Sequence, residues 1–221
     1  MPMPFDTDAV HYPDSDGEPM AENARQALII RTLILGFERR FSGRRDAWVG
    51  GDCFWYPVQG DPRTVTAPDV IVVTDLPAPI DVRSLGSYRQ WEHGPPPLLV
   101  VEVLSPSNTP ADMIRKLAFY DQFGVREYWV VDPDHGLLEI HWRDGDRLVP
   151  AVHPEEGWVS PFTSVRVSMV DGEVVVVDPD GERRWLAPID EAHRADEAVH
   201  RAAELAARVA ELEQRLRDLG G

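Results

Sequence analysis

The chain has 221 residues, of which 38 are acidic and 22 basic, and its net charge is −16. A strongly negative protein repels a polyanion, so this charge argues against a general nucleic-acid binder. Its single cysteine, Cys53, cannot close an intramolecular disulfide, and no apolar run approaches the ~20 residues of a membrane span. The amino terminus lacks the basic and apolar regions of a signal peptide, so we expect a soluble cytoplasmic protein.

The basic residues are unevenly divided, because Lys116 is the only lysine and all the others are arginine. Arginine stays charged, whereas lysine is a compact point charge whose pKa responds to its surroundings. Lys116 is therefore either a chance survivor of a composition biased toward arginine or a residue with a specific role.

Residues 1–20 form an acidic lead-in that is rich in Pro, Gly and Asp, and we expect it to be extended. From Ala21 to about Phe41, apolar residues recur every three or four positions, which predicts a helix that Ser42-Gly43 ends. Two later runs, Ala67–Thr74 and Leu98–Leu104, are nearly continuous in Val, Ile and Leu. Such runs predict strands that are covered on both faces.

A further β-rich stretch, Ala47–Tyr56, precedes these runs, and a long proline-rich surface excursion, Asp75–Pro97, separates them. After the second run, Thr109 is placed to cap a helix that starts with Pro110 and ends near Phe123. Further strands are predicted at Glu127–Asp132, at its antiparallel partner Leu137–Trp142, and in hairpin-like pieces at 147–153, 164–170 and 173–178.

The C-terminal segment, residues 190–221, carries a heptad pattern. Apolar residues step by three and four along Ala195, Ala198, Ala202, Leu205, Val209, Leu212, Leu216 and Leu219. Arginine and acidic residues also repeat every seven positions, at the spacing of favourable i, i+4 ion pairs. We expect a coiled-coil-like helix that either forms a homodimer through residues 195–219 or packs on its own domain.

Two carboxylates interrupt the apolar strands: Asp69 at the head of one run and Glu102 inside the other. An ionised carboxylate in such surroundings is costly unless it is paired or bound to a cation. Either each acid makes a structural contact, such as a salt bridge to an arginine, or the two form a site. With the backbone carbonyl of Val103, they would suit Mg²⁺ or Mn²⁺. The histidines and the lone cysteine lack the spacing of a zinc site.

Asp112, Lys116 and Tyr120 are spaced by four and so share one face of the predicted helix. That helix can pack back over the strand of Glu102, and Lys116 would then point at the carboxylate pair. There it would orient a water molecule and stabilise the charge of a phosphoryl transition state. Alternatively, Lys116 forms a surface pair with Asp112, and Tyr120 either holds a phosphate or Lys116 or is a packed aromatic residue.

These motifs resemble the Uma-two (Uma2) family of restriction endonucleases, a branch of the PD-(D/E)XK nuclease superfamily. The similarity rests on Pro68-Asp69-Val70, on VVEVLSPSN at 100–108 and on DMIRKLAFYDQFGVREYWVVDPD at 112–134. The segments YPDSDGEPMAEN and GDCFWYPVQGDP also look like members of that family. The resemblance implies an α/β fold of mixed α+β type, with a restriction-endonuclease-like mixed central sheet flanked by helices and extra β-hairpins. This domain would span residues 21–188, with its motif core at 66–142.

The resemblance also implies Mg²⁺-dependent hydrolysis of phosphodiester bonds, with Asp69 as the first acid and Glu102 as the second. The lysine of an E-x-K motif would stand at position 104, on the same face of the strand, but Leu104 is found there. Lys116 is the lysine that can replace it from the next helix. Glu22 resembles an acid that related nucleases bring to the metal from the first helix, although Asn23 is as close.

Three functions follow from these patterns. The first is a metal-dependent endonuclease with DNA as its substrate. The second is a non-catalytic, oligomeric interaction module on a nuclease-like fold, which the acidic composition favours. The third is a carboxylate-pair hydrolase that acts on a smaller substrate such as a sugar.

Overall fold

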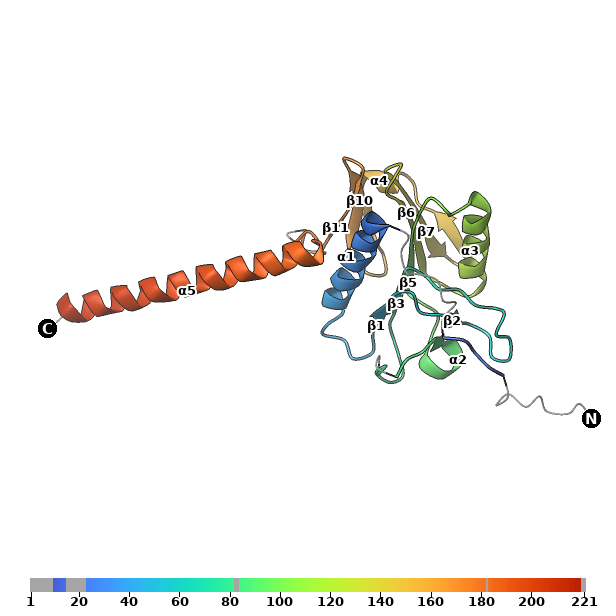
Figure 1. The fold of residues 1–221 in the computed structure, drawn as a ribbon, viewed down its shortest axis with the longest axis horizontal. Helices are drawn as coiled ribbons and strands as arrows, with labels where there is room; N and C mark the ends of the chain where they lie inside the picture. Colours follow the sequence, from blue (N-terminus) through green and yellow to red (C-terminus); the bar gives the residue numbers. More distant parts are fainter. Residues whose placement is uncertain (1–9, 15–22, 82–83, 182, 220–221) are drawn as a thin grey trace, which may run out of the picture. The chain divides into compact units, whose positions relative to one another are not determined.

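A computed structural model describes residues 10–14, 23–81, 84–181 and 183–219 (Figure 1). The chain divides into two compact units, Met1–Trp185 and Leu186–Gly221. The division falls a few residues before the boundary predicted between 188 and 190. Most of the predicted lead-in, residues 1–20, lies outside the described residues. Within the described part, no helix combines the length and apolar character that crossing a membrane requires.

The first unit is built on a six-stranded mixed sheet with the order β1-β3-β5-β6-β7-β8. Its central pair, β5 and β6, is parallel, and every other neighbouring pair is antiparallel. A parallel pair needs a crossover, which α3 (Pro110–Gln122) supplies. The strands are β1 (Trp48–Gly50), β3 (Val70–Val73), β5 (Leu99–Val103), β6 (Glu127–Asp132), β7 (Leu137–Asp144) and β8 (Arg147–Pro150).

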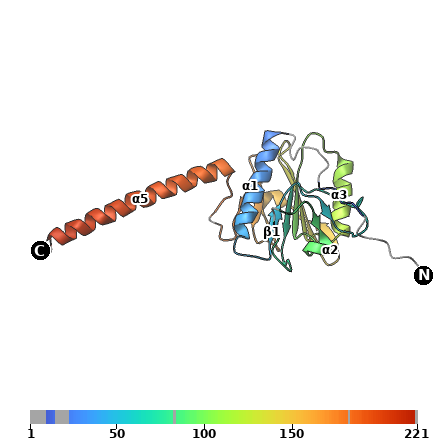
Figure 2. The same ribbon diagram turned by 60° about the horizontal axis from the view of Figure 1, so that its bottom comes forward.

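Helices cover both faces of this sheet, with α1 (Ala24–Arg40) on one side and α3 on the other (Figure 2). Phe37 of α1 belongs to a core that includes Val70 and Val101, whereas Tyr120 of α3 belongs to a second core with Ile71 and Val100. Alternate residues of β3 and β5 thus enter different cores, so every residue of both strands is buried. This confirms the prediction of strands covered on both faces.

Two smaller sheets flank the central one. Strands β9 (Trp158–Val159), β10 (Arg166–Val170) and β11 (Glu173–Val177) form an antiparallel sheet, and β2 (Trp55–Tyr56) pairs in parallel with β4 (Tyr88–Arg89). The predicted excursion Asp75–Pro97 therefore contains a strand, together with the short helix α2 (Gln90–His93). Another short helix, α4 (Pro154–Gly157), precedes β9.

The β-rich stretch predicted at Ala47–Tyr56 contains two short strands, β1 and β2, which belong to different sheets. The chain turns between them at Asp52, whose φ of 51° lies in the left-handed region. Gly51 makes this turn possible, since a Cβ there would lie 2.3 Å from the backbone oxygen of Asp69. The turn therefore sits directly against the residue that begins the catalytic motif predicted from the sequence.

The start of α3 follows the predicted capping pattern. The Thr109 side chain accepts a hydrogen bond from the backbone N–H of Asp112, and the Asp112 carboxylate accepts one from the backbone N–H of Thr109. Together with Pro110 at the first helical position, this box determines where α3 begins. The helix ends before Gly124, whose φ of +87° continues the chain into β6.

The second unit is a single helix, α5 (Pro188–Leu219), of 32 residues. Its large apolar side chains are strongly exposed: Val199 by 69%, Leu205 by 65%, Val209 by 54% and Leu212 by 49%. The heptad pattern thus lies on one continuous helix and presents apolar side chains to solvent.

Candidate active site

Asp69 and Glu102 stand opposite each other on adjacent strands. The antiparallel register pairs Val70 with Val101, so the next position pairs Asp69, just before β3, with Glu102 of β5. Directly opposite residues point to the same face of a sheet. The backbone N–H of Val103 donates a hydrogen bond of 2.7 Å to Oδ2 of Asp69 and ties this end of the two strands together. The two acids predicted from separate runs therefore share one face and one end of the sheet.

Glu102 is only 2% exposed, and both of its carboxylate oxygens have partners on α3. Lys116 places Nζ 2.6 Å from Oε2, and the Tyr120 hydroxyl donates to Oε1 at 2.5 Å. The two residues lie one helical turn apart, so both reach the same strand. The cation beside Glu102 is thus the single lysine of the chain and not an arginine.

Asp112 takes no part in this contact. Its carboxylate accepts hydrogen bonds from Thr109 and is paired with Arg115. The alternative prediction of a surface pair between Lys116 and Asp112 is therefore wrong, because the capping box and Arg115 hold Asp112 while Glu102 holds Lys116.

Tyr120 is both a packed aromatic residue and a polar contact. Its ring is fully buried and stacks on Trp55 at a centroid distance of 6.3 Å. Its hydroxyl lies 3.5 Å from Oγ1 of Thr66 in addition to its bond with Glu102. Tyr120 therefore holds Glu102, and the prediction that it holds Lys116 is wrong.

Position 104, where a lysine was expected from the E-x-K motif, is occupied by a core residue. Leu104 is partly buried and packs against the core beneath α3. A leucine there adds to the apolar packing on the face where Glu102 lies. The positive charge instead arrives from Lys116, whose side chain is 28% exposed and can reach both Glu102 and solvent.

The electrostatics of the pair favour a cation. Burial, followed by the negative charge of Glu102, raises the pKa of Asp69 from 3.8 to about 7, although the Val103 N–H and Lys116 oppose the change. A carboxylate whose pKa is raised by a second carboxylate beside it is a place where a divalent cation can relieve repulsion. Their hard oxygen atoms and the nearby carbonyl of Val103 fit Mg²⁺ or Mn²⁺.

Gln26 is a neighbour of the site that the sequence patterns did not single out. It lies on α1, is 5% exposed, and donates from Nε2 to the carbonyl oxygen of Val103 at 2.8 Å. This is the carbonyl predicted to face a metal, and a carbonyl has a second lone pair for another partner. The signal in the sequence was a polar residue at helical spacing from Ile30 and Leu33 on the buried face of α1.

Glu22, the acid predicted at the opening of the first helix, lies outside the described residues. Its neighbour Asn23 caps α1, because its Oδ1 accepts a hydrogen bond of 2.9 Å from the backbone N–H of Gln26. Asn23 therefore determines where the helix that carries Gln26 begins.

Another buried acid, Glu127, has a different environment. Its Oε1 accepts hydrogen bonds of 2.7 Å from the indole N–H groups of Trp129 and Trp158, and its Oε2 accepts one from the hydroxyl of Ser160. These uncharged donors tie β6 to the segment around β9. Among the described residues, Glu127 has the contacts of a structural acid, and neither a second carboxylate nor an ammonium group is bonded to it.

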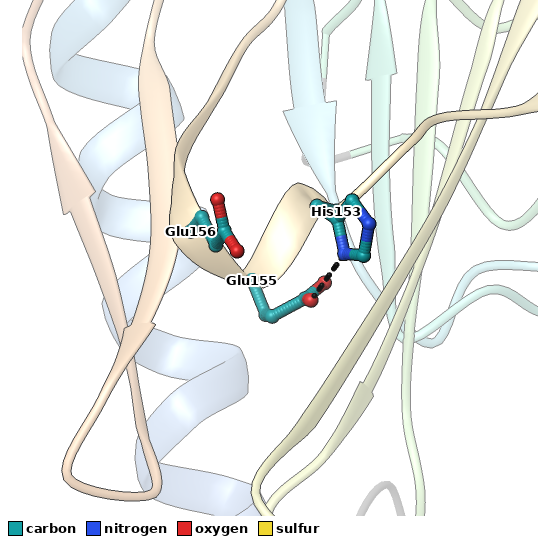
Figure 3. A group of neighbouring side chains, drawn as sticks. All are labelled: His153, Glu155 and Glu156. Carbon is teal, nitrogen blue, oxygen red and sulfur yellow. Dashed lines mark hydrogen bonds and ion pairs between the residues drawn. The ribbon is translucent and has the colours of Figure 1, made fainter.

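An exposed group of possible ligands lies at α4, where His153, Glu155 and Glu156 bring one atom each within 4.8 Å of one another (Figure 3). His153 and Glu155 already contact each other at 3.1 Å. All three come from neighbouring positions in the chain and are exposed. Exposed groups of this kind are common without a metal, so the pair of the half-buried Asp69 and the buried Glu102 is the stronger candidate site.

Comparison with known proteins places these observations in a family. The family model named Uma2, "Putative restriction endonuclease", matches residues 1–165. Among solved structures, the chain is similar to a "putative nuclease belonging to DUF820" from Anabaena variabilis ATCC 29413, with 16% sequence identity and a TM-score of 0.50. The similarity covers 66% of this chain and 77% of that one and shows the fold alone. No curated protein matches the chain. The predicted mixed sheet flanked by helices is thereby confirmed.

Proposed function

The chain belongs to the Uma2 family of restriction-endonuclease-like proteins, and we propose that it is a Mg²⁺-dependent endonuclease that hydrolyses phosphodiester bonds of DNA. The observation that carries this proposal is the pairing of Asp69 with Glu102 across β3 and β5, with Lys116 at 2.6 Å from Glu102. Two acids can hold a divalent cation beside a phosphodiester, and an ammonium group can stabilise the negative charge that develops in the transition state.

Asp69, Glu102 and the Val103 carbonyl would hold the metal, with Mn²⁺ as an alternative ion. Bound Mg²⁺ would supply Lewis acidity toward a phosphoryl oxygen and lower the pKa of an attacking water. The protein contributes a rigid frame for these ligands, because Asp69 is held by the Val103 N–H and Glu102 by the Tyr120 hydroxyl.

In this proposal, the ammonium group of Lys116 stabilises the negative charge of the transition state. Its ammonium group donates to Glu102 in this structure, and its partial exposure lets the same group meet a phosphate or a water at the edge of the site. Tyr120 acts through Glu102 as a positioning residue, because a fully buried hydroxyl bonded to the carboxylate limits how the carboxylate can rotate.

Gln26 is a second proposed positioning residue. It holds the carbonyl of Val103, while the N–H of the same residue holds Asp69. One residue of β5 thus connects α1 to the first acid. A change at Gln26 would therefore disturb the site without removing either carboxylate.

The direct test is nicking of supercoiled plasmid DNA with Mg²⁺ or Mn²⁺, compared among the wild-type protein, Asp69→Asn and Glu102→Gln. We expect both variants to lose nicking while circular dichroism shows a folded chain. Glu156→Gln is the matched control, because it removes one carboxylate from the exposed α4 group and should retain activity. Nicking by highly purified Asp69→Asn protein at the wild-type rate would refute the proposal.

The acidic composition favours a second candidate, a non-catalytic interaction module on the same fold. Thermal denaturation separates the two functions, since a ligand that binds only the folded state raises the melting temperature. The nuclease predicts that Mn²⁺ stabilises the wild-type protein and that Asp69→Asn abolishes this stabilisation. The interaction module predicts that Mn²⁺ leaves the melting temperature of both proteins unchanged.

A further inference from the structure

The helix α5 carries a repeating charge pattern beside its apolar seam. With Ala195 taken as heptad position a, the seam positions a and d of the described side chains are Ala195, Ala198, Ala202, Leu205, Val209 and Leu212. Position g is arginine in every heptad, at Arg194, Arg201, Arg208 and Arg215. Position e holds Val199, Ala206 and Glu213, so the two sides of the seam differ in charge.

The seam is exposed where it is largest. Leu205 and Val209 are 65% and 54% exposed, and Val199 at position e, which widens the seam, is 69% exposed. A helix of this length would normally bury such a stripe against another element. Ion pairs can also stabilise α5 without a partner, because glutamate and arginine residues recur along it at the favourable i, i+4 spacing.

The charges on either side of the seam discriminate between orientations. In an antiparallel coiled coil, position g faces position g of the other helix, and because every g residue is arginine, any register that uses this seam places arginine against arginine. In a parallel pair, position g faces position e of the next heptad in the other helix. Arg208 then faces Glu213, while Arg194 and Arg201 face Val199 and Ala206.

We propose that α5 pairs with α5 of a second copy of this chain in a parallel, in-register coiled coil. The occupant is a second copy because the arginine side and the Glu213 side complement each other within one sequence. The seam begins with alanines and continues with leucine and valine, so only an in-register parallel pair packs alanine against alanine and the larger side chains against each other.

The orientation has a consequence for the nuclease-like units. A helix of 32 residues spans about 48 Å at 1.5 Å per residue. A parallel pair brings both Pro188 ends, and hence both attached units, to the same end of the coil. An antiparallel pair would hold them at opposite ends. Two sites attached at one end suit an enzyme that acts on both strands of a duplex, and this clause alone rests on the proposed function.

The test is disulfide trapping in the full-length chain with Cys53→Ser, which removes its only native thiol. Ala198→Cys places a thiol at position d near one end of the helix, and His200→Cys places one at position f on the far side. We expect oxidation to convert the Ala198→Cys protein into a covalent dimer on a non-reducing gel and the His200→Cys protein to remain largely uncoupled. Light scattering should give a mass twice that of the 24.9 kDa chain before oxidation.

Charge reversal provides an independent arm. Glu213→Arg should weaken self-association several-fold by facing Arg208, and Arg208→Glu combined with it should restore association. Asp196→Arg is the matched control, because it makes the same change of charge at position b, away from the partner. A monomer in solution, a dimer in which Ala198→Cys fails to couple, or equal effects of Glu213→Arg and Asp196→Arg would each overturn the proposal. DNA nicking plays no part in these measurements, so they are independent of the fate of the nuclease proposal.

Discussion

Lys116 Nζ lies 2.6 Å from Glu102 Oε2, although the two residues come from a helix and a strand that are 14 positions apart. The E-x-K motif expected from the sequence resemblance would place the lysine at position 104, two residues after the glutamate. Here the lysine arrives from α3, and Leu104 packs into the core. The ammonium group beside Glu102 therefore comes from the following helix and not from the strand of Glu102 itself.

This relationship predicts a rescue by relocation. Lys116→Ala should lower the nicking rate by about 10²–10³-fold, the usual cost of removing one hydrogen-bond donor that stabilises a transition state. Adding Leu104→Lys to Lys116→Ala should recover part of the rate, because position 104 lies on the same face as Glu102. The measurement is plasmid nicking at saturating Mg²⁺. Arg115→Ala, on the exposed side of α3, should cut at close to the wild-type rate, and a double variant as inactive as Lys116→Ala would count against Lys116 as a relocated lysine.

The raised pKa of Asp69 predicts a pH-dependent stability. Its pKa is about 7 in the folded chain and 3.8 normally, so the folded state binds more protons between these values. The free energy of unfolding should therefore fall as the pH rises through this window and level off above it. Asp69→Asn cannot ionise and should lack this component. The measurement is the melting temperature of both proteins in EDTA between pH 3.8 and about 7. If the two melting temperatures change with pH in parallel, the raised pKa does not belong to Asp69.

The same titration predicts how metal affinity varies with pH. A proton on Asp69 competes with the cation, so Mn²⁺ affinity should rise as the pH increases toward about 7 and change less above it. Isothermal titration calorimetry of the wild-type protein tests this expectation. Glu156→Gln should give the same profile, and a profile that is flat with pH would contradict a site built on Asp69.

Tyr120 and Tyr128 form a natural pair of variants. Tyr120→Phe removes the hydroxyl that holds Glu102 and should cost roughly 1.5–3 kcal/mol of unfolding free energy, the range for a hydrogen bond to a charged group. Tyr128→Phe is the control, because the Tyr128 hydroxyl meets only the sulfur of Met113, at 3.8 Å, among the bonds found for it. Urea denaturation compares the two, and nicking should fall more for Tyr120→Phe. Equal losses would show that Tyr120 acts only through packing.

Gln26 is tested by a substitution of similar size. Gln26→Leu leaves the buried carbonyl of Val103 without its amide donor and should cost about 1–3 kcal/mol of unfolding free energy. It should also weaken Mn²⁺ binding, because the carbonyl and, through the Val103 N–H, Asp69 become less well held. Gln122→Leu, at the exposed end of α3, is the matched control. If Gln26→Leu lowers stability but leaves Mn²⁺ affinity unchanged, Gln26 is structural and not a positioning residue.

Much of the fold follows from local patterns. Thr109, Pro110 and Gly124 bound α3 because capping and backbone preference act over a few residues. The continuous apolar runs of β3 and β5 indicate strands whose two faces are both packed against other elements, since apolar side chains on both faces must be kept from water. The break at Gly51 and Asp52 was missed, because an apolar stretch does not show that its two halves pair with different partners.

The sequence by itself determined that acids interrupt the apolar runs of this chain, that it has one lysine and that it carries a heptad pattern, because composition and periodicity depend only on residue type and spacing. Only the tertiary structure decided which groups meet. The strand register sets Asp69 opposite Glu102, the crossover brings Lys116 and Tyr120 onto Glu102, and α1 delivers Gln26 to Val103. Such contacts join residues far apart in the chain, and their partners depend on how strands pair and helices pack, which no local pattern specifies.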